Sequence, residues 1–97
     1  MIVKRYAVYI LYSEAFDKYY IGQTGNIEKR LFQHNHSTTS TFTSRYRPWV
    51  LKQTLTFNTR ATAMQVEKYL KAKRKAFWQR VISDYELQSY IYDRFGK

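Results

Sequence analysis

The 97-residue sequence predicts a small α/β domain of the layered α+β type, in which a three-stranded, mainly antiparallel sheet is flanked by helices. Three observations predict this class. Two strand-like segments follow each other closely near the N-terminus, and so short a connection favours antiparallel pairing. A third strand-like segment lies between two segments of helical period. The hydrophobic content of 44% is enough to fill one core, and a chain of this length has room for only one.

The first half of the chain predicts two strands and a helix. Residues 6–12 form an apolar and aromatic run without polar interruption, which is typical of a central strand covered on both faces. The polar residues 13–18 suit a hairpin loop, and residues 19–23 form the second strand. After a turn, Asn26 is a candidate N-cap for a helix over 27–34.

The second half predicts a loop, a strand and two helices. Residues 36–47 are rich in Ser and Thr and are expected to form a loop or a short helical turn. Residues 49–57 form the third strand. Thr59 can cap a helix over 60–73, and a further helix is expected over 75–83.

These elements assign residues 1–83 to the domain. The remaining tail, residues 84–97, is aromatic and mixed in charge. Its composition leaves two possibilities open, a short helix packed on the domain or a contact with another chain.

The charge balance points to an anionic partner. Lys plus Arg number 17 and Asp plus Glu only 7, which gives a net charge of +10. Nucleic acid is the leading candidate, because its phosphates supply a matching line of negative charge. An anionic membrane surface is a weaker one, because no segment joins a basic face to a broad apolar face.

The absence of cysteine and of a targeting segment narrows the class further. Without cysteine there is no disulfide framework and no thiolate zinc site. The N-terminal apolar run is short and follows Lys4 and Arg5, so it suits a strand rather than a signal peptide or a membrane span. We therefore expect a cytoplasmic protein.

Two polar residues lie on the border of the apolar stripe of the first predicted helix. Ile27 and Leu31 define that stripe, and Arg30 and His34, four residues apart, share its edge. A guanidinium that turns towards the sheet needs a partner, which a phosphate could provide. Two plainer interpretations stay open: that Arg30 covers the sheet edge with its stem, and that His34 is an ordinary residue at a helix end.

A carboxylate falls within the inward stripe of the second predicted helix. Ala63, Val66 and Leu70 mark this stripe, and Glu67 lies four residues after Ala63. A carboxylate in such a place is paired, protonated or bound to metal. A structural ion pair with Arg30 is one possibility, and a site for one Mg²⁺ ion completed by water and phosphate oxygens is the other.

Two of the ten tyrosines are candidates for chemistry. Tyr9 and Tyr20 could face each other across the first hairpin, on the side that Arg30 approaches. A phenol titrates near pH 10, so it can act as a general base only if cationic neighbours lower its pKa. Arg30, a bound metal or Lys18 could do this.

Basic side chains concentrate in two places. The densest run carries no acid and is expected to contact the nucleic-acid backbone; it comprises Lys68, Lys71, Lys73, Arg74 and Lys75. A second patch consists of Arg45 and Arg47, which flank Tyr46, an aromatic residue able to stack on a base.

In these features the sequence resembles the small single-domain branch of the GIY-YIG nuclease family. "AVY" at residues 7–9 stands where the GIY motif lies, and "YIG" at residues 20–22 matches the second motif. Arg30 and His34 match the arginine of the family's first helix and the His or Tyr one turn later. "FTSRYRPWVL" and "ATAMQVEKYLKAKR" resemble the loop and strand and the glutamate helix of that branch, so that the resemblance spans about residues 6–82.

The resemblance implies a role for each candidate residue. Tyr9 would be the general base that activates water, and Tyr20 the second tyrosine of the site. Arg30 would stabilise charge on the phosphate, and His34 would orient or help to activate the nucleophile. Glu67 would hold a single Mg²⁺ or Mn²⁺ ion. The implied partner is DNA, with branched or damaged DNA among the candidate substrates.

The resemblance thus implies a metal-dependent endonuclease that hydrolyses DNA phosphodiester bonds. The sequence departs from the family pattern at Ala7, which replaces the first Gly, and at Gln23, where some relatives carry Lys. Two other functions stay open: a non-catalytic nucleic-acid-binding module of the same fold, and a protein-interaction domain that uses the aromatic tail.

Overall fold

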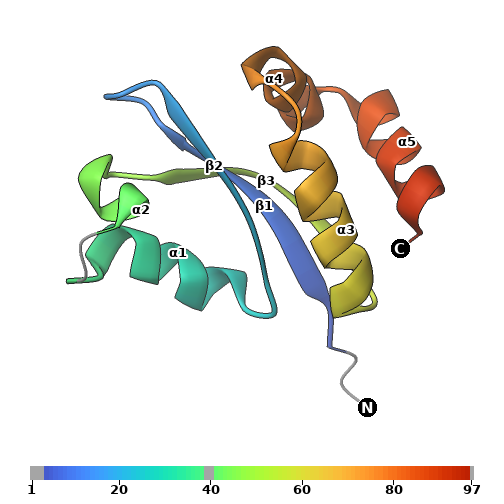
Figure 1. Ribbon diagram of the computed structural model, residues 1–97, viewed down its shortest axis with the longest axis horizontal. Coiled ribbons are helices and arrows are strands. Elements are labelled where there is room, and N and C mark those ends of the chain that lie inside the picture. Colours follow the sequence, from blue (N-terminus) through green and yellow to red (C-terminus); the bar gives the residue numbers. More distant parts are fainter. Residues whose placement is uncertain (1–3, 39–40, 97) are drawn as a thin grey trace.

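The computed structural model describes residues 4–38 and 41–96, and in these ranges one sheet lies between two groups of helices (Figure 1). Some sequence predictions extend beyond these ranges. Residues 1–3 of the predicted domain, 39–40 of the predicted 36–47 loop, and 97 of the predicted tail lie outside the described residues.

The sheet has three strands in the order β2-β1-β3, and both pairings are antiparallel. Its strands are β1 (Tyr6–Ser13), β2 (Lys18–Thr24) and β3 (Val50–Phe57). In this register Tyr9 of the central strand lies opposite Gly22 of β2. The prediction of a three-stranded antiparallel sheet with a central first strand is confirmed.

One face of the sheet is covered by α1 (Ile27–His36) and α2 (Phe42–Arg45). Side chains alternate between the faces of a strand, so Tyr9 and Leu11 of β1 both point to this side. Together with Trp49 they form a small buried cluster under the two helices. Of the residues predicted for the site, Tyr9, Tyr20, Arg30 and His34 lie on this side, whereas Glu67 belongs to α3.

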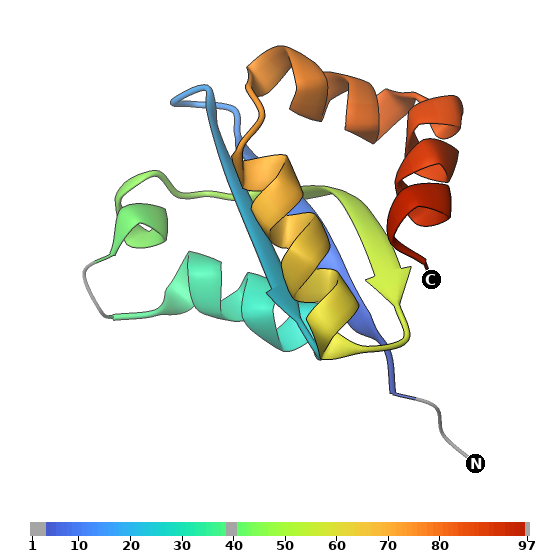
Figure 2. The same ribbon diagram turned by 45° about the vertical axis from the view of Figure 1, so that its right-hand side comes forward.

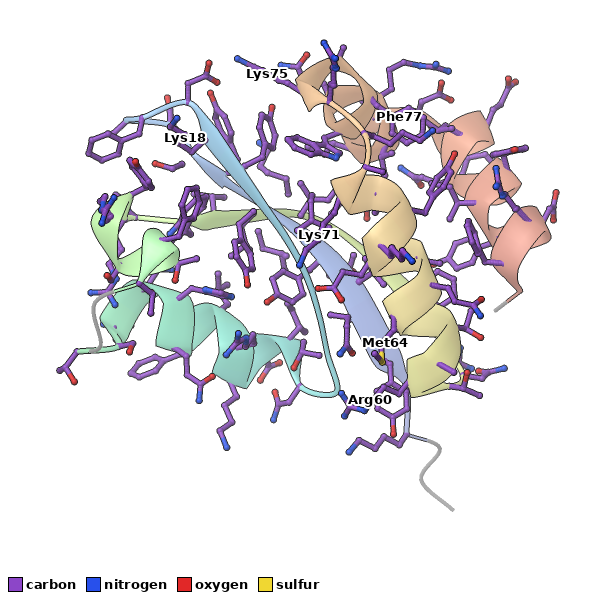
Figure 3. The ribbon with its side chains drawn as sticks, viewed as in Figure 1. Lys18, Arg60, Met64, Lys71, Lys75 and Phe77 are labelled. Carbon is purple, nitrogen blue, oxygen red and sulfur yellow. The ribbon has the colours of Figure 1, made fainter. Side chains whose placement is uncertain are left out.

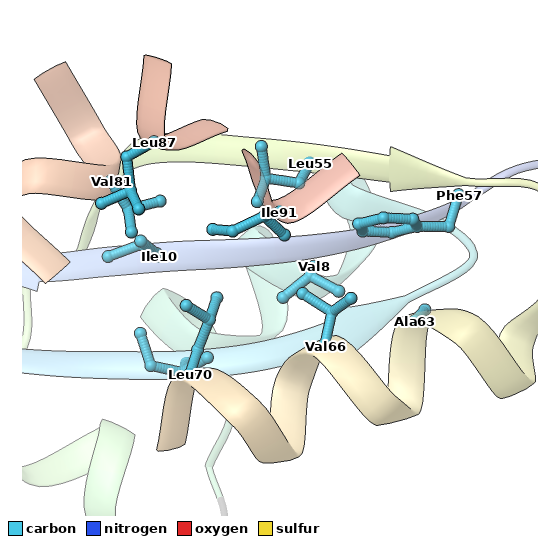
Figure 4. Close-up of a cluster of buried hydrophobic side chains, with 11 residues drawn as sticks. Val8, Ile10, Leu55, Phe57, Ala63, Val66, Leu70, Val81, Leu87 and Ile91 are labelled. Atoms are coloured by element: carbon cyan, nitrogen blue, oxygen red, sulfur yellow. The ribbon is translucent and has the colours of Figure 1, made fainter. Parts of the chain in front are cut away.

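The opposite face is covered by α3 (Arg60–Lys71), α4 (Lys75–Ser83) and α5 (Tyr85–Phe95), with α3 packed along β1 and β2 (Figure 2). The main hydrophobic core lies here, and most of its side chains are labelled in Figure 4. Its buried members are Val8, Ile10, Ile21, Leu55, Phe57, Ala63, Val66, Leu70, Val81, Leu87 and Ile91.

The predicted helix caps are present. The side chain of Asn26 accepts a hydrogen bond from the backbone N–H of Lys29 at 3.1 Å, and that of Thr59 accepts one from Thr62 at 3.1 Å. Such caps satisfy N–H groups that have no partner inside the helix. The Asn26 cap fixes where α1 begins, and so fixes which of its residues face the sheet.

Several elements differ from the predicted bounds by one or two residues, and the short helical turn that was one possibility within 36–47 is present. The helix predicted over 60–73 ends at Lys71, because Lys73 N–H bonds the Leu70 carbonyl at 2.9 Å and Arg74 is extended. The predicted 36–47 loop contains α2, whose first turn is closed by reciprocal hydrogen bonds between residues 41 and 44.

The C-terminal segment forms α5, which packs against the domain. Leu87 and Ile91 are buried in the main core between α5, α3 and α4. The Tyr92 hydroxyl accepts a hydrogen bond from the backbone N–H of Thr56 in β3 at 3.0 Å. The apolar side of the tail is therefore used within the chain.

Candidate active site

Tyr9 lies at the centre of the candidate site, and Gly22 makes room for it. The Tyr9 side chain is 1% exposed and its ring crosses directly over Gly22 on the neighbouring strand. A Cβ atom at position 22 would stand 2.4 Å from the Tyr9 Oη atom and 2.6 Å from Cζ, distances at which atoms collide. Only glycine lets the phenol take this position. The centroid of the Tyr20 ring lies 6.3 Å from that of the Tyr9 ring.

The Tyr9 hydroxyl is hydrogen-bonded to His34. The distance between Tyr9 Oη and His34 Nε2 is 2.9 Å, and both side chains are buried. The His34 ring also lies 4.7 Å from the Tyr20 ring. When the proton of neutral His34 is on Nδ1, Nε2 accepts this bond; in the other tautomer it donates. The pair joins a β1 residue to an α1 residue 25 positions away.

The C-terminal half of α1 is held in place by a polar clamp. The Asn35 side chain donates to the Trp49 carbonyl at 3.0 Å and accepts from the Trp49 N–H at 2.7 Å. The Arg47 guanidinium donates to the His34 carbonyl at 2.8 Å and to the Ser37 carbonyl. These bonds satisfy carbonyls at the end of the helix and fix His34 against the sheet.

Arg30 brings a positive charge to the two tyrosines. Its guanidinium interacts with the Tyr9 phenol and, more weakly, with Tyr20, and these contacts raise the pKa of Arg30. It also donates to the Gln33 side chain at 3.3 Å. Because Arg30 is largely exposed, its guanidinium is open to an anionic ligand.

Burial sets the ionisation of the site. It raises the pKa of the Tyr9 phenol to about 12, although the contact with Arg30 acts in the opposite direction. Burial, together with the nearby Arg30 charge, lowers the pKa of His34 to about 4. At neutral pH both groups are therefore uncharged. Lys18 contributes little to this balance, since its Nζ lies over the Tyr46 ring, 5.5 Å from the centroid.

Glu67 approaches from α3 on the other side of the sheet. Its charge reaches Tyr9, where it opposes ionisation of the phenol. Glu67 pairs with Lys71 at 3.1 Å, and within the described ranges no ion pair joins it to Arg30. Figure 3 shows the Lys71 side chain extending from α3 towards β2. The structural ion pair of Glu67 is therefore made with Lys71.

The residues present fit a magnesium ion held by one carboxylate. Among the described residues, no group of three or more His, Cys, Asp or Glu side chains forms a ready-made metal cage. Mg²⁺ does not require one, since it commonly binds through one or two carboxylates, water and substrate phosphate oxygens. The Glu67 side chain is 22% exposed, which leaves it open to such an ion.

Two cavities meet at Arg30. The first, of about 650 Å³, lies between α1 and α2 beside the tyrosine pair, and is lined by Tyr20, Arg30, Phe32, Gln33, His34, His36, Ser37, Thr38, Thr41, Phe42 and Thr43. The second, of about 550 Å³, lies at the start of α1, and is lined by Lys4, Gln23, Thr24, Gly25, Asn26, Lys29, Arg30, Gln33 and Arg60. Tyr20, Arg30 and His34 thus share a solvent-open hollow.

Three residues of the predicted basic run have partners within the chain. Lys71 pairs with Glu67, and Lys75 pairs with Asp17 of the first hairpin. The Lys73 Nζ atom lies over the Tyr69 ring, 4.6 Å from its centroid.

The other predicted DNA-contact residues differ in whether their side chains are exposed or make hydrogen bonds within the chain. Lys68, Arg74 and Arg45 are exposed. Arg47, in contrast, uses its guanidinium to hold the end of α1. The structure thus brings together Tyr9, Tyr20, Arg30 and His34, with Glu67 nearby, while the predicted DNA-contact residues lie on several elements.

Two contributions to the site were missed by reasoning from the sequence. The sequence indicates Gly22 only as the last residue of the YIG motif, whereas the strand register, which places it opposite Tyr9, shows its role. Asn35 and Trp49, which clamp α1 to the start of β3, leave no local pattern, because they are 14 positions apart.

Fold and site together define a class of protein. Residues 5–80 match the family model described as the GIY-YIG catalytic domain. This match covers most of the chain, and the chain belongs to the GIY-YIG family.

Similar proteins place it among the small members of the family. The chain is 32% identical over 77 residues to a UPF0213 protein of Natronomonas pharaonis, covering 79% of this chain and 89% of that one. The solution NMR structure of a UPF0213 protein from Bacillus halodurans superposes with a TM-score of 0.51 at 24% identity, covering 81% of this chain and 83% of that one. This structural likeness supports the fold.

The helices give no sign of a membrane span. Within residues 4–38 and 41–96, none combines the length and the apolar character that crossing a bilayer requires.

Proposed function

We propose that the protein is a metal-dependent endonuclease that hydrolyses DNA phosphodiester bonds at the site formed by Tyr9, Tyr20, Arg30, His34 and Glu67. The observation that carries this proposal is the buried 2.9 Å hydrogen bond between Tyr9 and His34, with Arg30 against the same phenol at the edge of an open cavity. Membership of a nuclease family supports it.

The Tyr9–His34 pair acts as the general base. With a pKa near 12, the phenol carries its proton at neutral pH and can accept a proton from water only as its own proton leaves. The hydrogen-bonded Nε2 of neutral His34 receives that proton. A phosphate bound at Arg30 offsets part of the positive charge that holds the pKa of His34 low, which makes the imidazole a better acceptor once substrate is bound.

Arg30 stabilises the negative charge that develops on the phosphate. A fixed guanidinium offers several donors to phosphate oxygens, and charge stabilisation of this kind is commonly a large part of catalysis. Tyr20 lines the same cavity and interacts with Arg30, so it can help to orient the phosphate or the attacking water. Arg30 and His34 lie one helical turn apart on α1, so the group that stabilises the phosphate and the group that accepts the proton lie on the same side of the helix.

Glu67 is the residue that would hold the divalent ion, Mg²⁺ or Mn²⁺. When bound, such an ion polarises the phosphate and stabilises the leaving oxygen. Glu67 would hold the ion in place of its Lys71 partner, and its charge would then oppose ionisation of Tyr9 less.

Cleavage of DNA tests the proposal. Supercoiled plasmid, branched DNA and single-stranded DNA are incubated with the protein in Mg²⁺ or Mn²⁺, and the same is done with Glu67→Ala and Arg30→Ala. We expect cleavage by the wild type and a loss of about 10²-fold or more in each variant. A matched control is Glu86→Ala, which removes an exposed carboxylate on α5 and should leave the rate unchanged.

The outcomes separate the alternatives. Equal cleavage by all three proteins would refute the assigned site. No cleavage by the wild type, together with salt-sensitive DNA binding, would favour a non-catalytic binding module.

A further inference from the structure

The second cavity gathers positive charge without a carboxylate. Among the described residues that line it, Lys4, Lys29, Arg30 and Arg60 are cationic and none is acidic. The remaining lining residues are neutral, and several of them offer hydrogen bonds. A hollow of about 550 Å³ with this lining suits an extended anion.

Two of these cations lie against the same aromatic ring, that of Tyr6. The Lys4 Nζ atom lies 5.5 Å from the centroid of the Tyr6 ring, and the Arg60 Cζ atom lies 4.7 Å from the same centroid. Arg60 donates to the neutral Gln23 side chain at 3.4 Å, and Figure 3 shows it beside the turn that leads from β2 into α1. Gly25 lets the Lys4 stem lie against this turn, since a Cβ there would stand 2.9 Å from Lys4 Cε.

None of the four cations is neutralised inside the described part of the chain. The ion pairs found in residues 4–38 and 41–96 involve Lys71, Lys75 and Arg80. Like charges held together in this way repel one another, and an anionic ligand relieves the repulsion.

The cavity adjoins the proposed catalytic site, since Arg30 and Gln33 line both hollows. A strand whose scissile phosphate contacts Arg30 would place its neighbouring phosphates along this second hollow. We propose that Lys4, Lys29 and Arg60 form a groove that binds the phosphodiester backbone of the DNA strand next to the cleaved bond. This proposal rests on the proposed function.

The groove differs from the basic run predicted from the sequence. In that run Lys71 is paired with Glu67 and Lys75 with Asp17, whereas no described cation of the groove is in an ion pair. The cations of the groove come instead from three distant parts of the chain: the residues before β1, the first turn of α1 and the start of α3.

Binding without cleavage tests the groove. The affinity for a fluorescent DNA oligonucleotide is measured by anisotropy in EDTA at several salt concentrations. The test protein is Lys29→Gln/Arg60→Gln. The control is Lys52→Gln/Arg94→Gln, which removes two exposed charges of β3 and α5, outside both predicted basic patches, and changes the net charge equally.

The groove variant is expected to bind about tenfold or more weakly. Its slope of log K against log salt should be shallower by about 1.4 for a single strand or 1.8 for a duplex, as for two lost phosphate contacts. The control should keep a slope close to that of the wild type.

Two results would overturn the groove: a wild-type slope in Lys29→Gln/Arg60→Gln, or the same loss in both double variants. Thermal unfolding checks that the variants are folded. Should the Arg60 replacement disturb the Tyr6 contact, Lys29→Gln alone carries the test, with an expected change in slope of about 0.7 to 0.9. Binding is read without metal, so failure of the groove is distinct from failure of the cleavage assay.

Discussion

Replacing Gly22 with alanine should displace Tyr9 and damage both stability and activity. The added Cβ would stand 2.4 Å from Tyr9 Oη, 2.6 Å from Tyr9 Cζ and 3.1 Å from Tyr20 Cε1. Tyr9 is 1% exposed and lies in a packed cluster, so its rigid ring cannot move aside freely. It must shift by several tenths of an ångström or more, which breaks the hydrogen bond to His34.

The expected magnitude follows from two terms. Overpacking of a buried site costs about 1–3 kcal/mol, and loss of a buried hydrogen bond adds about 1 kcal/mol. Gly22→Ala should therefore lower the free energy of unfolding by about 2–4 kcal/mol. Displacement of the catalytic phenol by such a distance should also reduce the cleavage rate by about 10²-fold.

Urea denaturation and single-turnover cleavage measure the two effects. Gly25→Ala is the matched control, because its Cβ would meet the flexible end of Lys4 at 2.9 Å, which can swing away. That variant should lose less than about 0.5 kcal/mol.

A double-mutant cycle makes the reasoning refutable. In the wild type, Tyr9→Phe removes an intact hydrogen bond to His34 and should cost about 1–2 kcal/mol. In the Gly22→Ala background that bond is already broken and Oη is the atom nearest to the added Cβ, so the same change should cost nothing or restore some stability. If the two changes were additive, or if Gly22→Ala were as stable as Gly25→Ala, the steric account of Gly22 would be wrong.

Two further predictions concern the elements around the site. Burial lowers the pKa of His34 from 6.5 to about 4. Between these two pH values the unfolded chain binds a proton on His34 that the native protein does not bind. The free energy of unfolding should therefore fall as the pH drops from about 6.5 towards 4, by about 2 kcal/mol at pH 5. Urea titrations at pH 7.5 and pH 5 should show this loss of stability in the wild type and in the control His36→Gln, but not in His34→Asn. The same loss in His34→Asn would show that His34 is not the source of the pH dependence. Arg47→Met should lower the free energy of unfolding by about 2 kcal/mol, because the Arg47 guanidinium donates to two carbonyls at the end of α1. The control Arg45→Met, at an exposed position, should change the free energy of unfolding by less than about 0.5 kcal/mol. Equal values for the two variants would argue against this role of Arg47.

The layers of the fold could be predicted because each rests on a local pattern. An unbroken apolar run indicated the central strand, and the capping residues Asn26 and Thr59 fixed the starts of two helices. The end of α3 could not be predicted, since no Gly or Pro marks it. It is set by the hydrogen bond from Lys73 to Leu70 and by packing of α4 on the core.

The site was predictable to the extent that its residues lie in recognisable motifs. Arg30 and His34 are four residues apart on one helix face, so helical spacing is enough to predict that they lie next to each other. Spacing could not show the protonation state of the site residues. Burial depends on the whole fold, and it raises the pKa of Tyr9 although the interaction with Arg30 acts in the opposite direction.

Surface electrostatics were the hardest part to predict. Lysines adjacent in sequence suggested a DNA-binding run, yet Lys71 and Lys75 are paired with Glu67 and Asp17. The unpaired charge next to the site belongs to residues that only the tertiary structure brings together. Whether the run also contacts DNA stays a prediction.

The most direct test of the account is the single-turnover rate of DNA cleavage by Tyr9→Phe. This change removes one hydroxyl, the group to which the proposed mechanism assigns proton transfer from water to His34, and keeps the buried ring. Tyr12→Phe is its matched control, since it removes a hydroxyl from the same strand that bonds only the exposed Asp17. We predict that Tyr9→Phe cleaves about 10²–10⁴-fold more slowly than the wild type, while Tyr12→Phe cleaves normally. A rate for Tyr9→Phe within threefold of the wild type would contradict the account.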